Sequence, residues 1–270
     1  MNTLNLVKRF GGVTNMESIE GVKRIFWGVA PTGDIHIAYF PYMAFLSEAK
    51  KAGHKIILFI GDFHGYWDGE KTKYQEIEAR TNYYINTFKK FGFEDDDIDL
   101  ASNIYFKKDY INLLFQFSNH LPNRQLLEYA DNTLKNETTG NYSFADMLYV
   151  ATQIIDVAYY DLDVVLCGKD ESGIYELGLP IVEYFLSRKV NHVYFEMVQG
   201  VISPEMHASN NSDNKITLHE DQRSILSKLS GNDLLYKSVN EYILPMFGIS
   251  GSEDKTEVAQ LLYNICNGRH

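Results

Sequence analysis

The chain has 270 residues and 45% hydrophobic content, enough to bury one sizeable core, or one large domain with a small appendage. Its formal net charge of −11 argues against a protein that binds nucleic-acid phosphates over a broad basic surface. Cys167 and Cys266 are its only cysteines and lack metal-ligand spacing, so we expect neither a disulfide framework nor a structural metal, and a cytoplasmic setting. No apolar run approaches the ~20 residues of a membrane span, so no membrane association is expected.

The first segment with a clear pattern is typical of a strand, a tight turn and the start of a helix. Apolar residues run from Ile25 to Val29, the turn is Pro31-Thr-Gly33, and an apolar-periodic segment opens at His36. The first amides of a helix lack partners and carry partial positive charge, so such a turn can bind phosphate, with His36 as a further donor. The alternative is a purely structural turn, because every α/β domain contains several strand-turn-helix units.

A second strand and its following loop repeat this arrangement. Helical spacing in Pro41–Ala52 ends at Gly53, and Lys55–Gly61 contains an unbroken apolar run. Such runs are typical of strands that are buried on both faces of a parallel sheet covered by helices. Asp62 and His64 come just after this strand, where ligands bind in open α/β sheets, although ordinary loop polarity explains them equally well.

The middle of the chain is predicted to be mainly helical and carries no chemical motif. We expect a helix over Lys73–Phe91, a short strand over Ile98–Ala101 and a helical pattern over Lys107–Lys135. The polar segment Asn136–Asn141 is predicted to be a mobile loop. We interpret residues from about 105 to about 140 as a helical insertion packed beside the sheet.

A polar stripe marks the helix predicted over Tyr142–Tyr160. Helical spacing places Tyr149, Gln153 and Asp156 on one face, among apolar neighbours. Burying these groups without partners is costly, and a small polar ligand would satisfy them. The alternative is a polar face that is turned toward solvent.

The last third of the chain begins with another strand that ends in polar residues. Asp163–Cys167 is predicted to be a buried strand, followed directly by Gly168, Asp170 and Glu171. The remaining predicted elements are a helix over Ser172–Arg188, a strand over His192–Val198, a loop over Gly200–Asn214, a helix over Ile216–Leu229, and two C-terminal helices over Asp233–Phe247 and Lys255–Cys266.

Together these segments resemble class I aminoacyl-tRNA synthetases, most closely the tyrosyl-tRNA synthetases of the eukaryotic and archaeal type, over roughly Arg24 to Phe247. The segments that carry the resemblance are His36-Ile-Ala-Tyr39, similar to the family's first signature, Asp62-Phe-His64-Gly-Tyr66, Tyr149 with Gln153 and Asp156, and Asp163 with Gly168-Lys-Asp-Glu171.

The resemblance implies an α/β fold, with a Rossmann-like (HUP-type) parallel sheet, a helical insertion and a short C-terminal helical appendage. The catalytic domain would cover residues 1–217 and a truncated helical domain residues 218–270. Because similar synthetases pair through the insertion, a homodimer through residues from about 105 to about 140 is also implied.

The implied reaction joins the carboxylate of tyrosine, or of a close analogue, to the α-phosphate of ATP and then passes the acyl group to tRNA. Mg²⁺ would arrive with ATP, and no tightly bound metal is implied. The catalytic positions are held by His36, Tyr39, Met206, His207 and Ser209. The amino-acid-binding positions are held by Phe26, Gly28, Ala30, Asp62, His64, Tyr149, Gln153, Asp156 and Glu171. The ATP-binding positions are held by Pro31, Thr32, Gly33, His36, Gly168 and Asp170.

Several positions depart from the family pattern. Glu205-Met-His-Ala-Ser209 stands where the family has a mobile Lys-Met-Ser-Lys-Ser loop, whose lysines neutralise pyrophosphate charge. Phe26 replaces a tyrosine that reads the substrate phenol, and Glu171 replaces a glutamine. These changes leave an alternative open: a synthetase paralogue that does not charge tRNA, and either uses another acceptor or acts as a catalytically impaired amino-acid-binding module.

Overall fold

The computed structural model describes residues 23–69, 71–122, 143–209 and 211–269, together with 5, 7, 8, 12–16, 21, 124–126 and 128. The loop predicted over residues 136–141 lies outside this set, as does the far end of the predicted insertion. No helix in the described part of the chain is long and apolar enough to cross a membrane.

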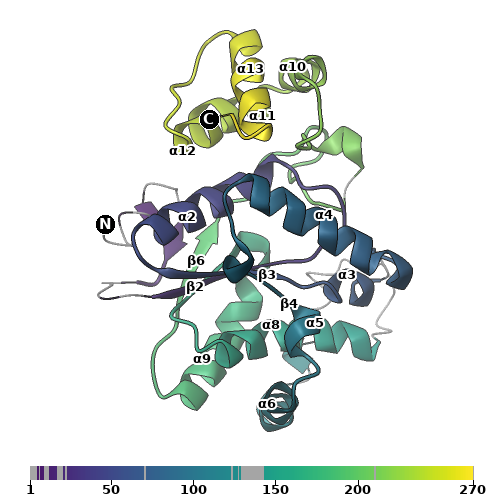
Figure 1. Ribbon diagram of the computed structural model, residues 1–270, viewed down its shortest axis with the longest axis vertical. Coiled ribbons are helices and arrows are strands. Elements are labelled where there is room, and N and C mark those ends of the chain that lie inside the picture. Colours follow the sequence, from purple (N-terminus) through teal and green to yellow (C-terminus); the bar gives the residue numbers. More distant parts are fainter. Residues whose placement is uncertain are drawn as a thin grey trace.

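One six-stranded sheet forms the centre of the described structure, in the order β1-β6-β5-β2-β3-β4 (Figure 1). Its strands are β1 (Val13–Thr14), β2 (Arg24–Val29), β3 (Lys55–Ile60), β4 (Ile98–Leu100), β5 (Val164–Gly168) and β6 (Asn191–Phe195). The strands from β2 to β6 run parallel, which confirms the predicted parallel sheet, and β1 pairs antiparallel with β6 at one edge. The two-residue strand β1 was not predicted, because so short a segment carries no periodicity.

Side chains on the central strands alternate between two buried clusters, one on each face of the sheet. On β2, Ile25 and Trp27 lie in the first cluster and Phe26 in the second. On β3, Leu58 lies in the first cluster and Phe59 in the second. This is the two-residue period of a strand covered on both faces, as the unbroken apolar runs predicted.

Helices cover both faces (Figure 1). On one face lie α2 (Phe40–Lys51) and α4 (Ile77–Lys90), and on the other lie α8 (Phe144–Tyr159) and α9 (Ser172–Leu186), with α6 (Lys108–Ser118) beside α8. Short helical turns complete this part: η1 (Ile37–Tyr39), α3 (His64–Trp67), η2 (Tyr74–Glu76), η3 (Asp95–Asp97), α5 (Ala101–Ile104), η4 (Lys169–Glu171) and η5 (Ser212–Asn214).

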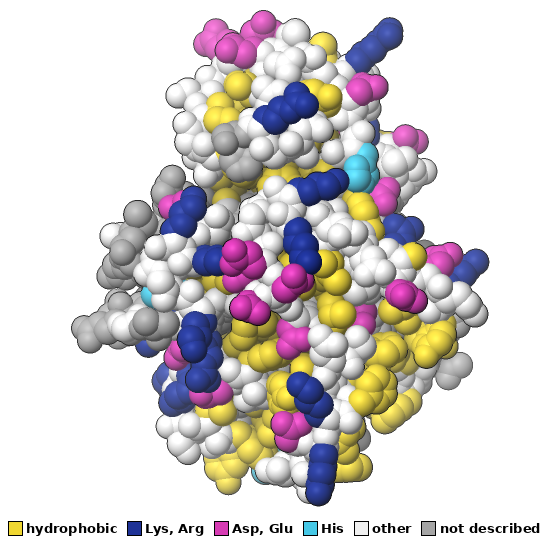
Figure 2. Space-filling model, in the orientation of Figure 1, with side chains coloured by type: hydrophobic (Ala, Val, Ile, Leu, Met, Phe, Trp, Pro, Cys, Tyr) yellow, Lys and Arg dark blue, Asp and Glu magenta, His cyan; other side chains and the backbone are white. Residues whose placement is uncertain are grey.

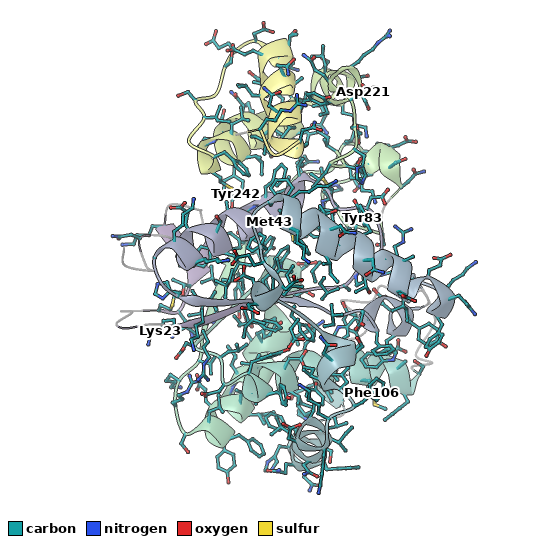
Figure 3. The ribbon with its side chains drawn as sticks, in the orientation of Figure 1. Lys23, Met43, Tyr83, Phe106, Asp221 and Tyr242 are labelled. Carbon is teal, nitrogen blue, oxygen red and sulfur yellow. The ribbon has the colours of Figure 1, made fainter. Side chains whose placement is uncertain are left out.

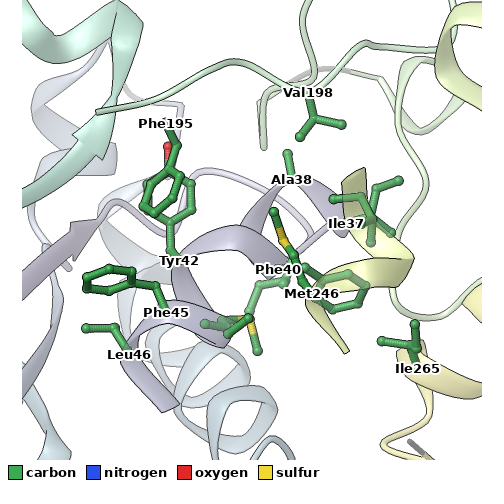
Figure 4. Packing of buried hydrophobic residues seen from close by; sticks show 14 of the residues in the cluster. Ile37, Ala38, Phe40, Tyr42, Phe45, Leu46, Phe195, Val198, Met246 and Ile265 are labelled. Carbon is green, nitrogen blue, oxygen red and sulfur yellow. The ribbon is translucent and has the colours of Figure 1, made fainter. Parts of the chain in front are cut away.

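The C-terminal helices stand on the α2 side of the sheet and share its core. They are α10 (Gln222–Gly231), α11 (Asp233–Lys237), the π-helix η6 (Ser238–Ile243), α12 (Leu244–Met246) and α13 (Lys255–Cys266). The rings of Phe40 and Phe247 lie 5.2 Å apart, and Met246 and Ile265 approach α2 in the same buried cluster (Figure 4). Met43 and Tyr242 lie in the layer between the two parts (Figure 3). The domain boundary at residues 217 and 218 stays a prediction.

Two predicted helices begin or end elsewhere. The helix expected from Ile216 starts only at Gln222, because the Asp221 side chain accepts the Ser224 amide at 2.8 Å as an N-cap. The helix expected over Lys107–Lys135 is interrupted, since α6 ends at Ser118 and a turn follows.

The strand order places β2 in the middle, with β5 on one side and β3 on the other. In a parallel sheet of this kind, the connections on the two sides of such a strand run to opposite faces and leave a crevice at its carboxyl end. The loops that follow β2 and β5 therefore border the position at which a ligand is expected.

Candidate active site

Two adjoining cavities lie at the carboxyl ends of β2 and β5. The larger has a volume of about 260 Å³ and the smaller about 30 Å³. They share Tyr149 and Glu171 in their walls, together with the end of β2. Of the residues predicted as a site, those that line the larger cavity are Gly28, Ala30, Thr32, His36, Tyr39, Tyr149, Gly168, Asp170, Glu171, Met206, His207 and Ser209.

The smaller cavity gathers most of the predicted amino-acid-binding residues. Those in its wall are Phe26, Gly28, Ala30, His64, Tyr149, Gln153, Asp156 and Glu171. Three predicted residues, Pro31, Gly33 and Asp62, line neither cavity. The carbonyl of Pro31 accepts a hydrogen bond from the Thr72 hydroxyl at 2.7 Å, and the Asp62 carboxylate accepts the Ser102 amide at 3.0 Å. These two residues fix loops around the site.

The turn that holds His36 is fixed from two sides. From α4, the Tyr84 hydroxyl donates to the carbonyl of Gly33 at 3.0 Å, and the Tyr83 hydroxyl accepts the Ile35 amide at 3.2 Å. From the other side, the extended segment Ile216–Leu218 pairs with residues 35–37, where Ile37 donates its amide to the Ile216 carbonyl at 3.1 Å. The imidazole position is therefore set by backbone and side-chain contacts from distant parts of the chain.

His36 has two buried ring nitrogens without a hydrogen-bond partner in the described structure. Its ring is 2% exposed and stacks on Tyr39, with 4.7 Å between ring centroids. Burial, helped by the nearby charges of Lys215 and His207, lowers the pKa of His36 to about 3. A neutral imidazole offers one N–H donor and one acceptor, and buried polar groups are rarely left unpaired. The His36 ring can therefore offer one donor and one acceptor toward the larger cavity.

The loop from Glu205 to Ser209 is folded against this turn. Met206 is 1% exposed, and a Cβ atom on Gly33 would lie 1.9 Å from the carbonyl oxygen of Ala208. Lys215 donates to the same carbonyl at 2.5 Å and does not line either cavity. Its ammonium group braces the loop, so the structure gives Lys215 a positioning role at this loop.

One cation in the larger cavity was not found from the sequence. Lys71 is the only lysine or arginine among the residues described as lining this cavity, and it pairs with Asp68 at 2.7 Å. The other carboxylate oxygen of Asp68 is buried without a partner. Both residues follow α3, just beyond the motif at His64, in a turn and a bend that no periodicity of the sequence indicates.

Asp156, which was predicted to meet a ligand, is already satisfied by the protein. The Tyr105 hydroxyl donates to one carboxylate oxygen at 3.0 Å and the Tyr110 hydroxyl to the other at 2.7 Å. Burial raises the pKa of Asp156 to about 8, against the opposing effect of these two hydrogen bonds. His64 lies beside the same network, and burial lowers its pKa to about 3, so its ring is neutral.

Glu171 stands where the two cavities meet. Burial raises the pKa of Glu171 to about 8, and the neighbouring negative charge of Asp170 adds to this. A bound cation at the junction would stabilise the ionised carboxylate and lower this pKa. No group of three or more histidine, cysteine, aspartate or glutamate side chains in the described residues could hold a metal ion.

Above about pH 6.5, the stability of the fold is expected to fall with rising pH because of Asp156; below that pH, the lowered pKa values of the buried His36 and His64 make stability rise with pH and oppose this effect. This carboxyl titrates at its ordinary pKa of 3.8 in the unfolded chain and at about 8 in the folded chain. Between these two pKa values, Asp156 keeps its proton in the folded state and has lost it in the unfolded state. The contribution of this proton to stability is complete below about pH 4 and is lost toward about pH 8. The expected slope is up to about 1.4 kcal/mol per pH unit. Chemical denaturation between about pH 6.5 and pH 8, where His36 and His64 no longer titrate strongly in either state, measures it.

An Asp156→Asn variant is the control for this pH dependence. The amide keeps the shape of the carboxyl group and does not titrate, so the unfolding free energy of the variant should change less with pH than that of the wild type. Glu171 has a raised pKa as well, and above about pH 6.5 it should leave a residual slope of the same sign. Equal slopes in the wild type and in the variant would contradict the assignment to Asp156.

Comparison with known proteins gives the family. Residues 18–232 match the profile of tRNA synthetases class I (W and Y). The cytoplasmic tyrosine-tRNA ligase of Saccharomyces cerevisiae is 25% identical over 216 residues, which cover 77% of this chain and 54% of the relative. The tyrosine-tRNA ligase of Natronomonas pharaonis is 28% identical over 217 residues, covering 76% and 60%. The chain thus spans a little over half the length of these relatives.

Solved structures agree on the fold. Tyrosyl-tRNA synthetase from Archaeoglobus fulgidus, complexed with L-tyrosine, superimposes with a TM-score of 0.82 at 18% identity, over 100% of this chain and 99% of that one. The enzyme from Pyrococcus horikoshii, also complexed with L-tyrosine, gives a TM-score of 0.77 at 15% identity, over 100% and 90%. Since the family profile covers most of the sequence, the chain belongs to the class I tRNA synthetases of the tryptophan and tyrosine group.

Proposed function

We propose that this protein activates an amino acid with ATP, forms an aminoacyl-adenylate and transfers the aminoacyl group to tRNA. The observation that carries the proposal is the pair of adjoining cavities. Unpartnered His36 borders the larger one, and the unpartnered amide oxygen of Gln153 lies in the wall of the smaller one. Two buried groups without partners on the two sides of one junction fit two substrates that react there.

The larger cavity suits the nucleotide. His36 supplies a neutral N–H donor, and Lys71 supplies a positive charge at the cavity wall. A carboxylate oxygen of the amino acid attacks the α-phosphorus, and pyrophosphate leaves with the electron pair of the broken P–O bond. This exchange requires stabilisation of the negative charge on the phosphates and no nucleophilic side chain. Mg²⁺, which arrives with ATP, would neutralise part of the same charge.

The junction between the cavities suits the amino group of the substrate. The Gln153 amide oxygen has no hydrogen-bond partner in the described structure, and Glu171 adds a carboxylate to the wall of the same cavity. An ammonium group donates up to three hydrogen bonds, so both oxygens fit it as acceptors. This position directs the carboxylate of the amino acid toward the larger cavity, where the α-phosphate would lie.

The tRNA step is supported by the names of the relatives. Their names give tyrosine as the amino acid and tRNA as the acceptor of those proteins. Lysine, arginine and acidic side chains are interspersed on the face seen in Figure 2, and the net charge is −11, so tRNA contacts here would be local. Tyrosine as the substrate and a homodimer both stay predictions; Phe106 and Phe115, 74% and 68% exposed, are available at the described end of the insertion.

Exchange of labelled pyrophosphate into ATP tests the activation step, with each standard amino acid assayed in turn. Exchange that depends on an amino acid supports the proposal. Charging of tRNA from the source then tests the second step. Exchange without charging would favour a different acceptor, and binding of an amino acid without any exchange would favour an amino-acid-binding module, as the carboxylate of Glu205 in the loop suggests.

Replacing Glu205 with lysine is expected to raise the exchange rate. The Glu205 carboxylate contacts the His207 ring at 3.1 Å, and His207 lines the larger cavity. A negative charge next to the phosphate site opposes the developing charge on pyrophosphate, and one well-placed donor is worth about 10²- to 10³-fold, so we expect a gain of at least about tenfold. Glu253→Lys makes the same charge change at an exposed position and serves as the control. A gain in both variants would indicate a general effect of charge.

A further inference from the structure

At one end of the polar face of α8, the hydrogen bonds to the Asp156 carboxylate come from the protein itself. Both carboxylate oxygens of Asp156 accept tyrosine hydroxyls, one from Tyr105 and one from Tyr110. A carboxylate at the end of a substrate pocket is well suited to accept a hydroxyl from a ligand. In this chain both oxygens already have such partners, so a ligand hydroxyl would have to share an oxygen with a tyrosine hydroxyl and find space beside the tyrosine side chains.

Tyr105 is held firmly in this position. Its hydroxyl lies 2.8 Å from Nε2 of His64 and 3.0 Å from Asp156, and both of these residues line the smaller cavity. Its ring stacks on Trp67, with 5.8 Å between centroids and 3° between planes, and is 6% exposed. Displacing the Tyr105 side chain would break two buried hydrogen bonds and expose an aromatic ring. A ligand that leaves Tyr105 in place therefore binds with a more favourable free energy.

Little space remains beside these groups. The smaller cavity measures about 30 Å³, and since one water needs about 10–15 Å³ on this scale, it holds about two water-sized groups. The Phe26 ring forms part of its wall. A phenol ring does not fit into this volume while Tyr105 and Phe26 keep their positions.

We propose that Tyr105 restricts this site to amino acids with small, uncharged side chains, of the size of alanine or serine, and excludes tyrosine, the substrate that the family resemblance implies and that this proposal replaces. The proposal rests on the proposed function, because it names the class of amino acid that the same site activates. Gln153 and Glu171 both line the smaller cavity, and Glu171 lines the larger one as well, so these two side chains would bind the amino group. Tyr105, at the end of α5, therefore acts as the specificity-determining residue.

The test compares three proteins: the wild type, Tyr105→Leu, which shortens the side chain, and Tyr105→Phe, which keeps its volume and removes the hydroxyl. Pyrophosphate exchange is measured with alanine, serine, phenylalanine and tyrosine. The wild type should favour alanine or serine over tyrosine in kcat/KM by at least about tenfold. Tyr105→Leu should raise the ratio for tyrosine over alanine by at least about tenfold, while Tyr105→Phe should keep the wild-type order.

Preference of the wild type for tyrosine would overturn the proposal, and this result does not depend on whether the variants fold. An unchanged ratio in a Tyr105→Leu protein with cooperative thermal unfolding would overturn it as well. If no amino acid supports exchange, the proposed function fails. Calorimetry with alanine and tyrosine then tests the size restriction by binding alone. Alanine binding to the wild type, with tyrosine binding only to Tyr105→Leu, would still support the size restriction. No binding of either amino acid to either protein would refute both proposals.

Discussion

Replacing His36 with alanine is expected to lower the rate of pyrophosphate exchange by about 10²- to 10³-fold, the usual effect of removing one well-positioned donor. The imidazole is neutral, 2% exposed and without a partner on either nitrogen, so its one N–H group is available to donate to a phosphate oxygen. Because the ring borders an existing cavity and forms no hydrogen bond within the described structure, its loss should change the unfolding free energy by only about 1 kcal/mol. Exchange kinetics and thermal unfolding measure the two effects.

The control is His192→Ala. His192 also has a buried ring nitrogen without a partner and stacks on a tyrosine, Tyr194, with 4.1 Å between centroids. It lies on β6 and lines neither cavity. The exchange rate of this variant should remain within about threefold of the wild type. A comparable loss of activity in both variants, or a loss below about tenfold for His36→Ala, would count against a role for His36 at the phosphates.

Substituting Gly33 with alanine is expected to reduce exchange by about 10²-fold or more. A Cβ atom at this position would lie 1.9 Å from the carbonyl oxygen of Ala208 and 3.3 Å from the ammonium nitrogen of Lys215. The neighbouring atom in closest contact is backbone, so the loop from Glu205 to Ser209 must move away from the turn. Its brace from Lys215 and its place over the larger cavity would both be disturbed.

Gly231→Ala is the matched control, because a Cβ atom there would meet nothing within 4 Å. The same substitution at this helix end should leave exchange unchanged. Proteolysis provides a second readout, since a displaced loop in Gly33→Ala should be cleaved faster between residues 205 and 209. Normal activity together with wild-type protease resistance in Gly33→Ala would show that this close contact has no functional weight.

Much of the sheet and half of the site could be predicted from local pattern. Unbroken apolar runs indicated β3 and β5, and the polar residues after them do line the cavities at His64 and Glu171. The spacing of Tyr149, Gln153 and Asp156 placed them on one face of α8, and all three line the smaller cavity. These features depend on periods of a few residues, which a single sequence displays directly.

The rest depends on contacts between segments that are distant in the sequence. The partners of Asp156 come from α5 and α6, some 50 residues upstream, and no local period indicates that Tyr105 fills the space beside it. The segment at Ile216 was expected to be helical because it is apolar, yet it pairs in extended form with the turn at His36. In both cases tertiary packing decides what local propensity leaves open.

The pairing of Ile216–Leu218 with the turn at His36 links the active site to the C-terminal helices. Leu218 donates its amide to the Ile35 carbonyl at 3.2 Å, and the chain enters α10 a few residues later. The helices of the appendage share a buried cluster with α2, which follows the same turn. A displacement of these helices would therefore shift both segments that flank the turn, Ile216–Leu218 and α2. The C-terminal helices therefore help to hold the His36 imidazole in place, and we expect that removing them would loosen the turn that carries this side chain.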